Sequence, residues 1–273
     1  PPPPPPRAPR GPAAAARRGW LVGLGVAASV AAAVLLLTPR LNPFSSPAET
    51  AAATLVQVYA TDAGQRNSVM LADGSLLSLN TDSEITVDMT ATQRQLTLRR
   101  GEAHFEVAHD TSRPFIVAVG EHAVRAVGTA FNIRRRGERE AEVLVTSGTV
   151  RVSGTPEVAV LNAGQLLALR ADGSGGVTTL DAEAIEARLA WRRGVLIFDG
   201  QTLAEAVAEI DRYTPKDIRI ADPELAGKRI VGYFPTDNLH TLLGSLQANF
   251  GVKVTEDETH ILLSARDGRA SPD

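Results

Sequence analysis

The 273-residue sequence contains no cysteine. This absence excludes a disulfide framework, a thiolate metal site, a cysteine nucleophile and lipidation on sulfur. Three further patterns are missing, namely G-x-S-x-G, a glycine-rich phosphate-binding loop and H-E-x-x-H. A hydrolase therefore has no catalytic constellation to support it. We expect a protein that is not an enzyme and that uses no cofactor, no metal and no small-molecule substrate.

Acidic residues slightly outnumber basic ones, with 31 Asp and Glu against 28 Lys and Arg and a formal net charge of −3. The first 37 residues hold four arginines and no acid, and subtracting these four charges from −3 leaves −7 for the body of the chain. Proteins that bind nucleic acid by bulk electrostatics set clustered Lys and Arg against phosphates. The acidic body argues against that mode, and we expect no nucleic-acid partner.

Residues 20–37, WLVGLGVAASVAAAVLLL, are 18 consecutive uncharged residues. An α-helix of this length spans about 27 Å, close to the ~30 Å hydrocarbon core of a bilayer. Two arginines precede the run and predict that this side stays in the cytoplasm. The residues that define the anchor and its orientation are Arg17, Arg18, Trp20, Leu21, Leu35, Leu36 and Leu37. The sequence therefore predicts a single-pass membrane protein whose C-terminal body is exported.

A cleaved signal peptide is the competing interpretation, because Arg17 and Arg18 loosely resemble a twin-arginine start. However, the apolar run exceeds the usual ~7–15 residues, and no small-x-small cleavage pair follows it closely. We therefore favour an uncleaved anchor.

The segments that flank the anchor are low in complexity. Residues 1–19 are a Pro/Ala/Arg-rich tract that we expect to be disordered in the cytoplasm, and residues 38–54 are a Pro/Ser/Ala stalk. A disordered tail is expected at residues 267–273.

Residues 55–179 contain short β-type runs every eight to twelve residues, separated by turn dipeptides such as Asp73-Gly74 and Ser147-Gly148. Leu96 and Leu98 alternate with polar residues, as in a strand with one buried face. This rhythm predicts an all-β domain, and it leaves a sandwich and a solenoid-like structure open.

The pattern changes to helical spacing at residues 180–193, which we interpret as a connector that buries Trp191. Residues 194–266 then carry an internal repeat, since a shift of 36 residues superposes Phe198 on Phe234. Each copy is predicted as strand, helix and strand. Thr202 and Glu205 form a capping box at the start of the first helix. A small α+β domain built from two βαβ repeats is expected.

Two surface features invite a functional interpretation. Glu102, His104 and Glu106 alternate along one strand, but a metal would need them to converge, so we interpret them as a solvated strand face. Tyr233 lies in a strand of the second repeat that is a candidate sheet edge, where a partner strand could add by β-augmentation.

Several long motifs together carry a family resemblance. They are LADGSLLSLNTDSEITV (71–87), RRGEAHFEVAHDTSRPFIV (99–117), VRAVGTAFNI (124–133), EVLVTSGTVRV (142–152) and AWRRGVLIFDGQTLAEAVAEIDRY (190–213). The first four resemble successive motifs of the FecR domain. The last, with the repeat after it, is similar to the short N-terminal domain of secretins and TonB-dependent receptors.

The resemblance implies a bacterial inner-membrane regulator of an extracytoplasmic-function sigma factor, with a periplasmic body, acting in iron-siderophore signalling. The implied partners are the signalling domain of a TonB-dependent outer-membrane receptor in the periplasm and the sigma factor in the cytoplasm. Members of the family place a helical sigma-binding domain before the anchor, and residues 1–19 cannot form one. We expect that this domain is truncated from the sequence, the alternative being its loss. Without it, a membrane-anchored structural or assembly protein of the envelope is the alternative function.

Gly128-Thr129 matches the pair at which members of the family are cleaved in the periplasmic domain. A threonine hydroxyl can attack the preceding carbonyl when the residue before it is small and the backbone is strained. The plainer interpretation is that Gly128 permits a turn or bulge and Thr129 starts the next strand.

Overall fold

The computed structural model describes residues 56–154 and 159–266. The predicted segments 1–19, 20–37, 38–54 and 267–273 lie outside these residues, and so do all the anchor and topology residues named above. Among the described residues, no helix has both the length and the apolar character needed to cross a bilayer. The membrane anchor and its orientation therefore stay predictions.

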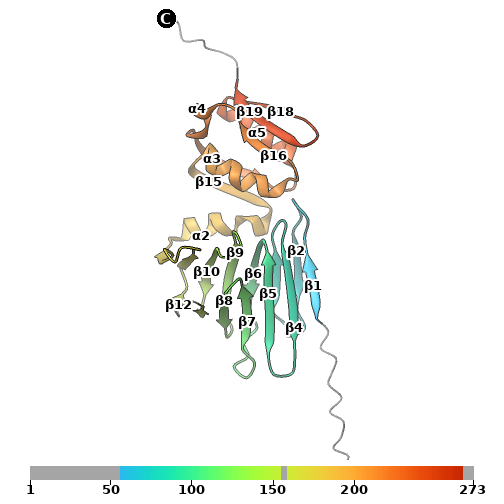
Figure 1. The fold of residues 1–273 in the computed structure, drawn as a ribbon, viewed down its shortest axis with the longest axis vertical. Coiled ribbons are helices and arrows are strands. Elements are labelled where there is room, and N and C mark those ends of the chain that lie inside the picture. The colour runs from blue at the N-terminus through green and yellow to red at the C-terminus, as the bar shows by residue number, and fades with distance from the viewer. Residues whose placement is uncertain (1–55, 155–158, 267–273) are drawn as a thin grey trace, which may run out of the picture. The chain divides into compact units, whose positions relative to one another are not determined.

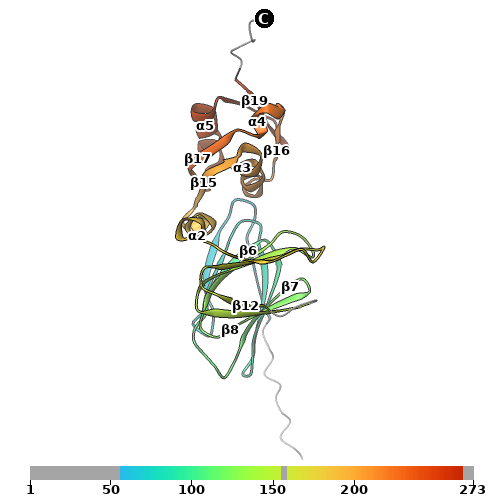
Figure 2. The same cartoon turned by 90° about the vertical axis from the view of Figure 1, so that its left-hand side faces the viewer.

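The N-terminal part of the described chain is a β-sandwich of two seven-stranded sheets packed face to face (Figure 1, Figure 2). Sheet A has the order β1-β4-β5-β7-β8-β11-β12, and sheet B has the order β14-β13-β10-β9-β6-β3-β2. The strands are β1 (Gln57–Ala60), β2 (Asn67–Met70), β3 (Leu76–Leu79), β4 (Glu84–Met89), β5 (Arg94–Arg100), β6 (Glu102–Glu106), β7 (Phe115–Val119), β8 (His122–Ala126), β9 (Ala130–Arg135), β10 (Ala141–Ser147), β11 (Thr149–Ser153), β12 (Ala159–Asn162), β13 (Gln165–Leu169) and β14 (Val177–Thr179). The predicted all-β domain is confirmed, and of the two architectures left open it is the sandwich.

Side-chain alternation fills the space between the sheets. Leu96 and Leu98 of β5 are fully buried, as their spacing predicts. Phe105 of β6 stacks on Phe131 of β9 with ring centroids 4.9 Å apart, and it meets Phe115 of β7 edge-on at 5.9 Å. Because Phe115 belongs to sheet A and the other two rings to sheet B, this aromatic cluster ties the two sheets together.

Part of sheet B, in strands β10 and β13, carries buried side chains on both faces. Leu144 of β10 and Leu166 of β13 are buried, yet they lie outside the cluster that fills the sandwich core. They line a cleft together with residues of α2 (Ala182–Leu189) and of the 3-10 helix η1 (Ala190–Arg193), which cover the outer face of the sheet. The expected burial of Trp191 in this connector is confirmed, since only 3% of its surface is exposed.

The C-terminal module, residues 194–266, contains a two-stranded sheet β15-β17 and a three-stranded sheet β16-β19-β18. Its elements are β15 (Val195–Thr202), α3 (Leu203–Ile210), the 3-10 helix η2 (Asp211–Tyr213), β16 (Asp217–Ile220), α4 (Pro223–Ala226), β17 (Arg229–Pro235), α5 (Leu239–Phe250), β18 (Val252–Glu256) and β19 (His260–Ala265). Both copies of the repeat show the expected strand, helix and strand, and Thr202 and Glu205 form the predicted capping box at the start of α3.

The pairing of these strands shows how the two predicted repeats combine in one domain. The first strands of the copies, β15 and β17, pair with each other, and the equivalent rings of Phe198 and Phe234 lie 5.5 Å apart. The second strands, β16 and β18, both pair with β19 in the other sheet. Each copy is thus divided between two sheets, because a helix with one apolar stripe is buried only when both copies share a single core.

Candidate functional site at the junction of the sandwich and the C-terminal module

The strand face of β6 is not solvated, which contradicts the sequence-based interpretation of Glu102 and His104. Only 3% of Glu102 and 2% of His104 is exposed, while Glu106 remains exposed. The reason is that the residues of η1 and η2 cover this face: Arg192 of η1 forms an ion pair with Glu106, and Arg212 of η2 forms one with Glu102. Within the described residues, no group of three His, Asp or Glu side chains could hold a metal ion.

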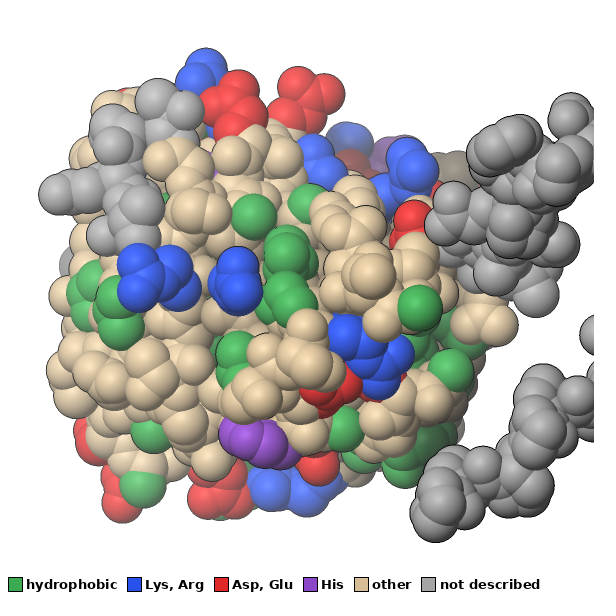
Figure 3. Space-filling model, turned by 90° about the horizontal axis from the view of Figure 1, so that it is seen from below, with side chains coloured by type: hydrophobic (Ala, Val, Ile, Leu, Met, Phe, Trp, Pro, Cys, Tyr) green, Lys and Arg blue, Asp and Glu red, His purple; other side chains and the backbone are tan. Residues whose placement is uncertain are grey.

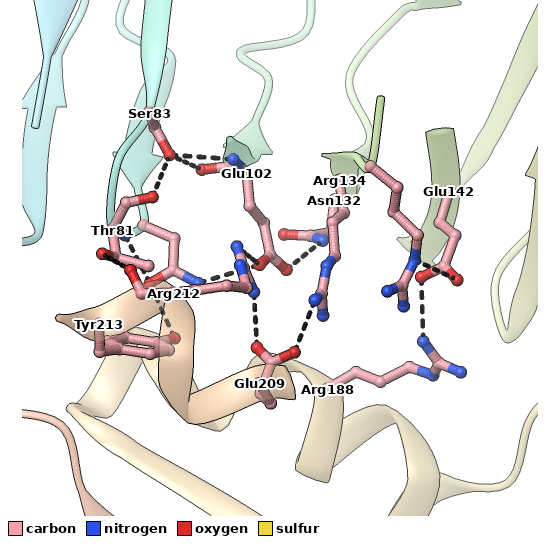
Figure 4. A network of polar contacts seen from close by, with 12 residues as sticks. Thr81, Ser83, Glu102, Asn132, Arg134, Glu142, Arg188, Glu209, Arg212 and Tyr213 are labelled. Carbon is pink, nitrogen blue, oxygen red and sulfur yellow. Dashed lines mark hydrogen bonds and ion pairs between the residues drawn. The ribbon is translucent and has the colours of Figure 1, made fainter. Parts of the chain in front are cut away.

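Glu102 is at the centre of a polar network that joins the sandwich to the C-terminal module (Figure 4). Its two carboxylate oxygens accept hydrogen bonds from the side-chain amides of Asn80 at 2.9 Å and Asn132 at 3.0 Å. Arg212 of the module adds a third donor at 3.0 Å. A buried carboxylate is tolerated when its oxygens are satisfied in this way.

Glu209 of α3 continues the network. Its two oxygens contact Arg134 of β9 and Arg212 of η2, each at 2.5 Å. The charges therefore alternate along Glu102, Arg212, Glu209 and Arg134 (Figure 4). Glu102 and Arg134 belong to the sandwich, and Arg212 and Glu209 belong to the module. Two of these three ion pairs therefore cross the junction.

The charges of this network are held in place electrostatically. Burial alone would raise the pKa of Glu209, but Arg212 and Arg134 hold that pKa below its ordinary value. Burial would likewise lower the pKa of Arg212, and the neighbouring Glu209 and Glu102 raise it instead. Both groups consequently stay charged across the physiological range of pH.

The 3-10 helix η2 also docks through uncharged groups. The Tyr213 hydroxyl donates to Asn80 Oδ1 at 3.0 Å, and the Thr81 hydroxyl donates to the Arg212 carbonyl at 2.8 Å. Gly64 has a positive φ of 79°, and a Cβ at this position would lie 2.9 Å from the Tyr213 carbonyl oxygen. Glycine is therefore required at this approach of the sandwich loop to the module. Burial raises the pKa of Tyr213 well above its usual range, so the hydroxyl keeps its proton.

Replacing His104 by glutamine should remove a pH dependence of stability. Burial, and after it the charge of Arg192, lower the pKa of His104 from 6.5 to about 3 in the folded protein. The unfolded chain takes up a proton below pH 6.5 and the folded protein does not, so stability is greatest above pH 6.5 and falls as the pH decreases toward 3. Between about pH 7.5 and about pH 5.5 the wild type should lose about 1.4 kcal/mol more than His104→Gln, as measured by urea unfolding. Equal losses in the two proteins would contradict this assignment.

Tyr233 lies where the sequence suggested, on a strand with an open edge. It is 74% exposed, and Val231 on the same strand is 62% exposed, while Phe234 between β15 and α5 is buried. Among the described residues β17 pairs only with β15. Two exposed apolar side chains on one strand are compatible with partner binding, which stays a prediction.

Gly128 and Thr129 lie directly before β9. Gly128 has a φ of 75°, and a Cβ there would come within 2.5 Å of His109 Nδ1. Thr129 is 6% exposed, and its hydroxyl has no hydrogen-bond partner in the described part of the chain. Its carbonyl accepts the backbone N–H of Val107 at 2.9 Å. This geometry fits the interpretation in which Gly128 forms a turn and Thr129 precedes a strand. Self-cleavage by the Thr129 hydroxyl stays a prediction.

One buried charge escaped the sequence analysis entirely. Arg94 at the start of β5 is 0% exposed and forms a 2.8 Å ion pair with Asp73. The same guanidinium donates to the carbonyls of Ala108, Asp110 and Arg113. Arg94 thereby fixes the loop between β6 and β7, which carries the His109 that contacts Gly128.

Charged side chains elsewhere on the molecule are mixed in sign. Figure 3 looks at the molecule from below the view of Figure 1 and shows Lys and Arg side chains interspersed with Asp and Glu among uncharged ones. This face offers no broad basic area among the described side chains that it shows.

The fold and the junction define a two-module protein: a β-sandwich to which a small α+β module is fixed by buried ion pairs. Residues 57–151, which lie in the sandwich, match the family model described as "FecR protein". The FecR resemblance of the sequence is thereby confirmed. The match ends before the C-terminal module, whose similarity to the short N-terminal domain of secretins stays a prediction.

Two solved structures share this fold. Both are crystal structures of a candidate anti-sigma factor from Parabacteroides distasonis ATCC 8503, at 2.50 Å and 1.65 Å resolution. Each is 24% identical to the chain, with TM-scores of 0.63 and 0.62. The similarity covers 77% and 76% of this chain and 99% and 98% of the other. A search among curated proteins gives no match.

Proposed function

We propose that the protein regulates a sigma factor as a membrane-anchored signal relay. The observation that carries this proposal is the FecR-family match over residues 57–151. The shared fold of a candidate anti-sigma factor, which includes the C-terminal module in its coverage, supports it. In this proposal residues 20–37 anchor the chain in the bacterial inner membrane with the body in the periplasm, and the effector part acts on an extracytoplasmic-function sigma factor in the cytoplasm.

The network at the junction suits a relay better than it suits catalysis. Its buried groups are carboxylates and guanidiniums that neutralise one another, and none is a nucleophile with an adjacent base. A rigid contact between two modules lets an event on one be felt by the other.

The experiment is to delete the gene in its source bacterium and to compare transcripts with and without the substrates of its TonB-dependent receptors. We expect the transcripts of one extracytoplasmic sigma factor's promoters to stop responding to one such substrate. Unchanged responses at every such promoter would refute the relay. An envelope defect without a transcriptional change would instead favour the anchored assembly protein.

We further propose that the signal enters at β17, where the signalling domain of a TonB-dependent receptor adds a strand beside Tyr233. The open strand edge and the exposed side chains of Val231 and Tyr233 support this docking mode. Main-chain hydrogen bonds would supply affinity, and these two side chains would supply specificity.

Self-cleavage at Gly128-Thr129 is part of the same proposal. The Thr129 hydroxyl oxygen attacks the Gly128 carbonyl carbon, the peptide C–N bond breaks, and the Thr129 nitrogen takes up the hydroxyl proton as a free amine. Water then hydrolyses the ester that has formed, which leaves a Gly128 carboxylate and restores the hydroxyl. The unpartnered Thr129 hydroxyl and the glycine before it support this step.

Thr129→Ala is expected to abolish a nick that yields fragments 1–128 and 129–273, because no nucleophile remains. Thr129→Ser should restore it. Mass spectrometry of the purified full chain identifies the bond. Thr149→Ala is the matched control: it alters another Gly-Thr pair, Gly148-Thr149, in which the Thr149 hydroxyl bonds to Asn162 Oδ1 at 3.0 Å. Nicking that persists in Thr129→Ala, or stops in Thr149→Ala, would reject the assignment.

A further inference from the structure

The first strand of the sandwich, β1, presents apolar side chains to solvent at an edge of sheet A (Figure 1). Val58 of β1 is 60% exposed, and Val56 just before the strand is 55% exposed. Met70 of β2, the last strand of sheet B on the same side of the sandwich, is 65% exposed. Large apolar side chains that gather in this way indicate a surface for another protein.

β1 also lacks the features that usually keep an edge strand from pairing, which are charged side chains, proline and bulges. Among the described residues it pairs only with β4, in a register without irregularity, so its other edge is open. Residues 56–61, VQVYAT, contain no charge and no proline. The edge of β1 can therefore accept a further strand through its main chain.

The outer face of sheet A beside β1 is free of charge in the row that contains Val58. Thr86 of β4 lies opposite Val58. Thr97 of β5 and Ala118 of β7 continue the row across the sheet. A second copy of the chain that adds at this edge with its own Val58 in the row therefore brings no like charges together there.

Two other open edges differ in this respect. Val160 of β12, at the opposite end of sheet A, is 52% exposed. Arg151 of β11 lies opposite Val160, and Arg125 of β8 lies opposite Arg151, so two copies paired through β12 would gather four positive charges in one row. The β17 edge carries Arg229 within the strand itself. Of these three edges, β1 is the one that two identical chains can share without repulsion.

The sequence of β1 is complementary to itself in an antiparallel pair. When Val58 lies opposite its counterpart, Gln57 lies opposite Tyr59 of the second copy, and Val56 lies opposite Ala60. Within one chain the Tyr59 hydroxyl donates to Gln57 Oε1 at 2.8 Å, so the same two groups are suited to bond across the pair. Such a contact uses the same surface on both copies and closes as a dimer.

We propose that the protein forms a homodimer in which β1 pairs antiparallel with β1 of a second copy and joins the two A sheets into one. This proposal goes beyond sigma-factor regulation and does not depend on it. It assigns to β1 a partner different from the receptor strand proposed for β17.

Disulfide cross-linking tests the contact, because the chain has no cysteine and each introduced thiol is the only one. The test uses the full chain in a neutral detergent with copper phenanthroline as oxidant. Val58→Cys should give mostly disulfide-linked dimer, since directly opposite residues of an antiparallel pair have Cα atoms about 4.5–5.5 Å apart. Val160→Cys is the matched control, because Val160 is similarly exposed on the other edge of the same sheet, and it should stay monomeric.

Two further variants test the register. Val56→Cys alone and Ala60→Cys alone should not cross-link, because four residues of strand separate each from its own counterpart by about 14 Å. An equimolar mixture of the two variants should cross-link, because residue 56 of one copy lies opposite residue 60 of the other.

Analytical ultracentrifugation measures the dissociation constant of the dimer without cross-linking. Val58→Lys should raise this constant about tenfold, because it sets two ammonium groups opposite each other. Val160→Lys should leave it within about twofold. A wild type that stays monomeric at about 100 μM would overturn the proposal. So would a dimer that Val58→Lys does not weaken, or cross-linking of Val160→Cys that equals that of Val58→Cys.

Discussion

Arg94→Met is expected to lower the free energy of unfolding of the β-sandwich by about 3–5 kcal/mol, because it removes one partner of a fully buried ion pair. Asp73 would keep a carboxylate that is 2% exposed, and the carbonyls of Ala108, Asp110 and Arg113 would lose their donor. Burial acts to raise the pKa of Asp73, and hydrogen bonds from Ser75 and Arg94 keep that pKa below its ordinary value. Without Arg94 fewer groups oppose the effect of burial, so the pKa of Asp73 should rise relative to the wild type and part of the loss should be recovered at acidic pH.

Urea unfolding followed by circular dichroism measures the change, and hydrogen exchange should show faster opening of the loop between β6 and β7. Arg151→Met is the control, because Arg151 is exposed, forms no ion pair among the described residues and should change stability by less than about 0.5 kcal/mol. A loss below about 1 kcal/mol in Arg94→Met would show that the sandwich does not depend on this charge.

Arg212→Met is expected to detach the C-terminal module from the sandwich, at a loss of about 3 kcal/mol of interaction free energy. The substitution leaves Glu102 and Glu209 facing each other across the junction without the guanidinium between them. The module has its own hydrophobic core, so it should remain folded after it separates.

Hydrogen exchange at the amides of η2 and proteolysis within the connector report the separation. Arg219→Met provides the comparison, because its pair with Asp217 is exposed and surface pairs contribute only about 0–1 kcal/mol. A double-mutant cycle with Glu102→Gln isolates the pair across the junction. If the amides of η2 exchange at the wild-type rate in Arg212→Met, the ion pairs do not hold the module.

Local pattern was sufficient to predict the sandwich strands, because the alternation of Leu96 and Leu98 is a property of neighbouring residues. The same alternation places Arg94 on the inward face, and this was the one available signal for its burial. The residue type instead predicts that Arg94 is exposed, because arginine is almost never fully buried without a partner. Its partner Asp73 is 21 residues away, and only the tertiary fold brings the two together.

The burial of the outer face of sheet B could not be predicted from the pattern of neighbouring residues. The polar residues of β6 look solvated until η1 and η2 pack on them, and nothing in that strand indicates which element does so. A weaker signal exists in β10 and β13, where Leu144 and Leu166 interrupt a strict alternation with adjacent apolar residues. Consecutive apolar residues are typical of strands that are buried on both faces.

The repeat predicted the elements of the C-terminal module correctly but not their partners. Sequence similarity between copies reports equivalent environments, and Phe198 and Phe234 do share one. It does not report whether strands pair within a copy or between copies, because both arrangements bury the same residues.

The alternating order of Glu102, Arg212, Glu209 and Arg134 makes the attachment of the module a matter of register. Sliding the module along this row would bring Arg212 toward Arg134 in one direction or Glu209 toward Glu102 in the other. Like charges would then face each other, so we expect the observed arrangement to be favoured over its neighbours. Under force, we therefore expect the module to separate from the sandwich in one cooperative step, without intermediate positions along the row of charges.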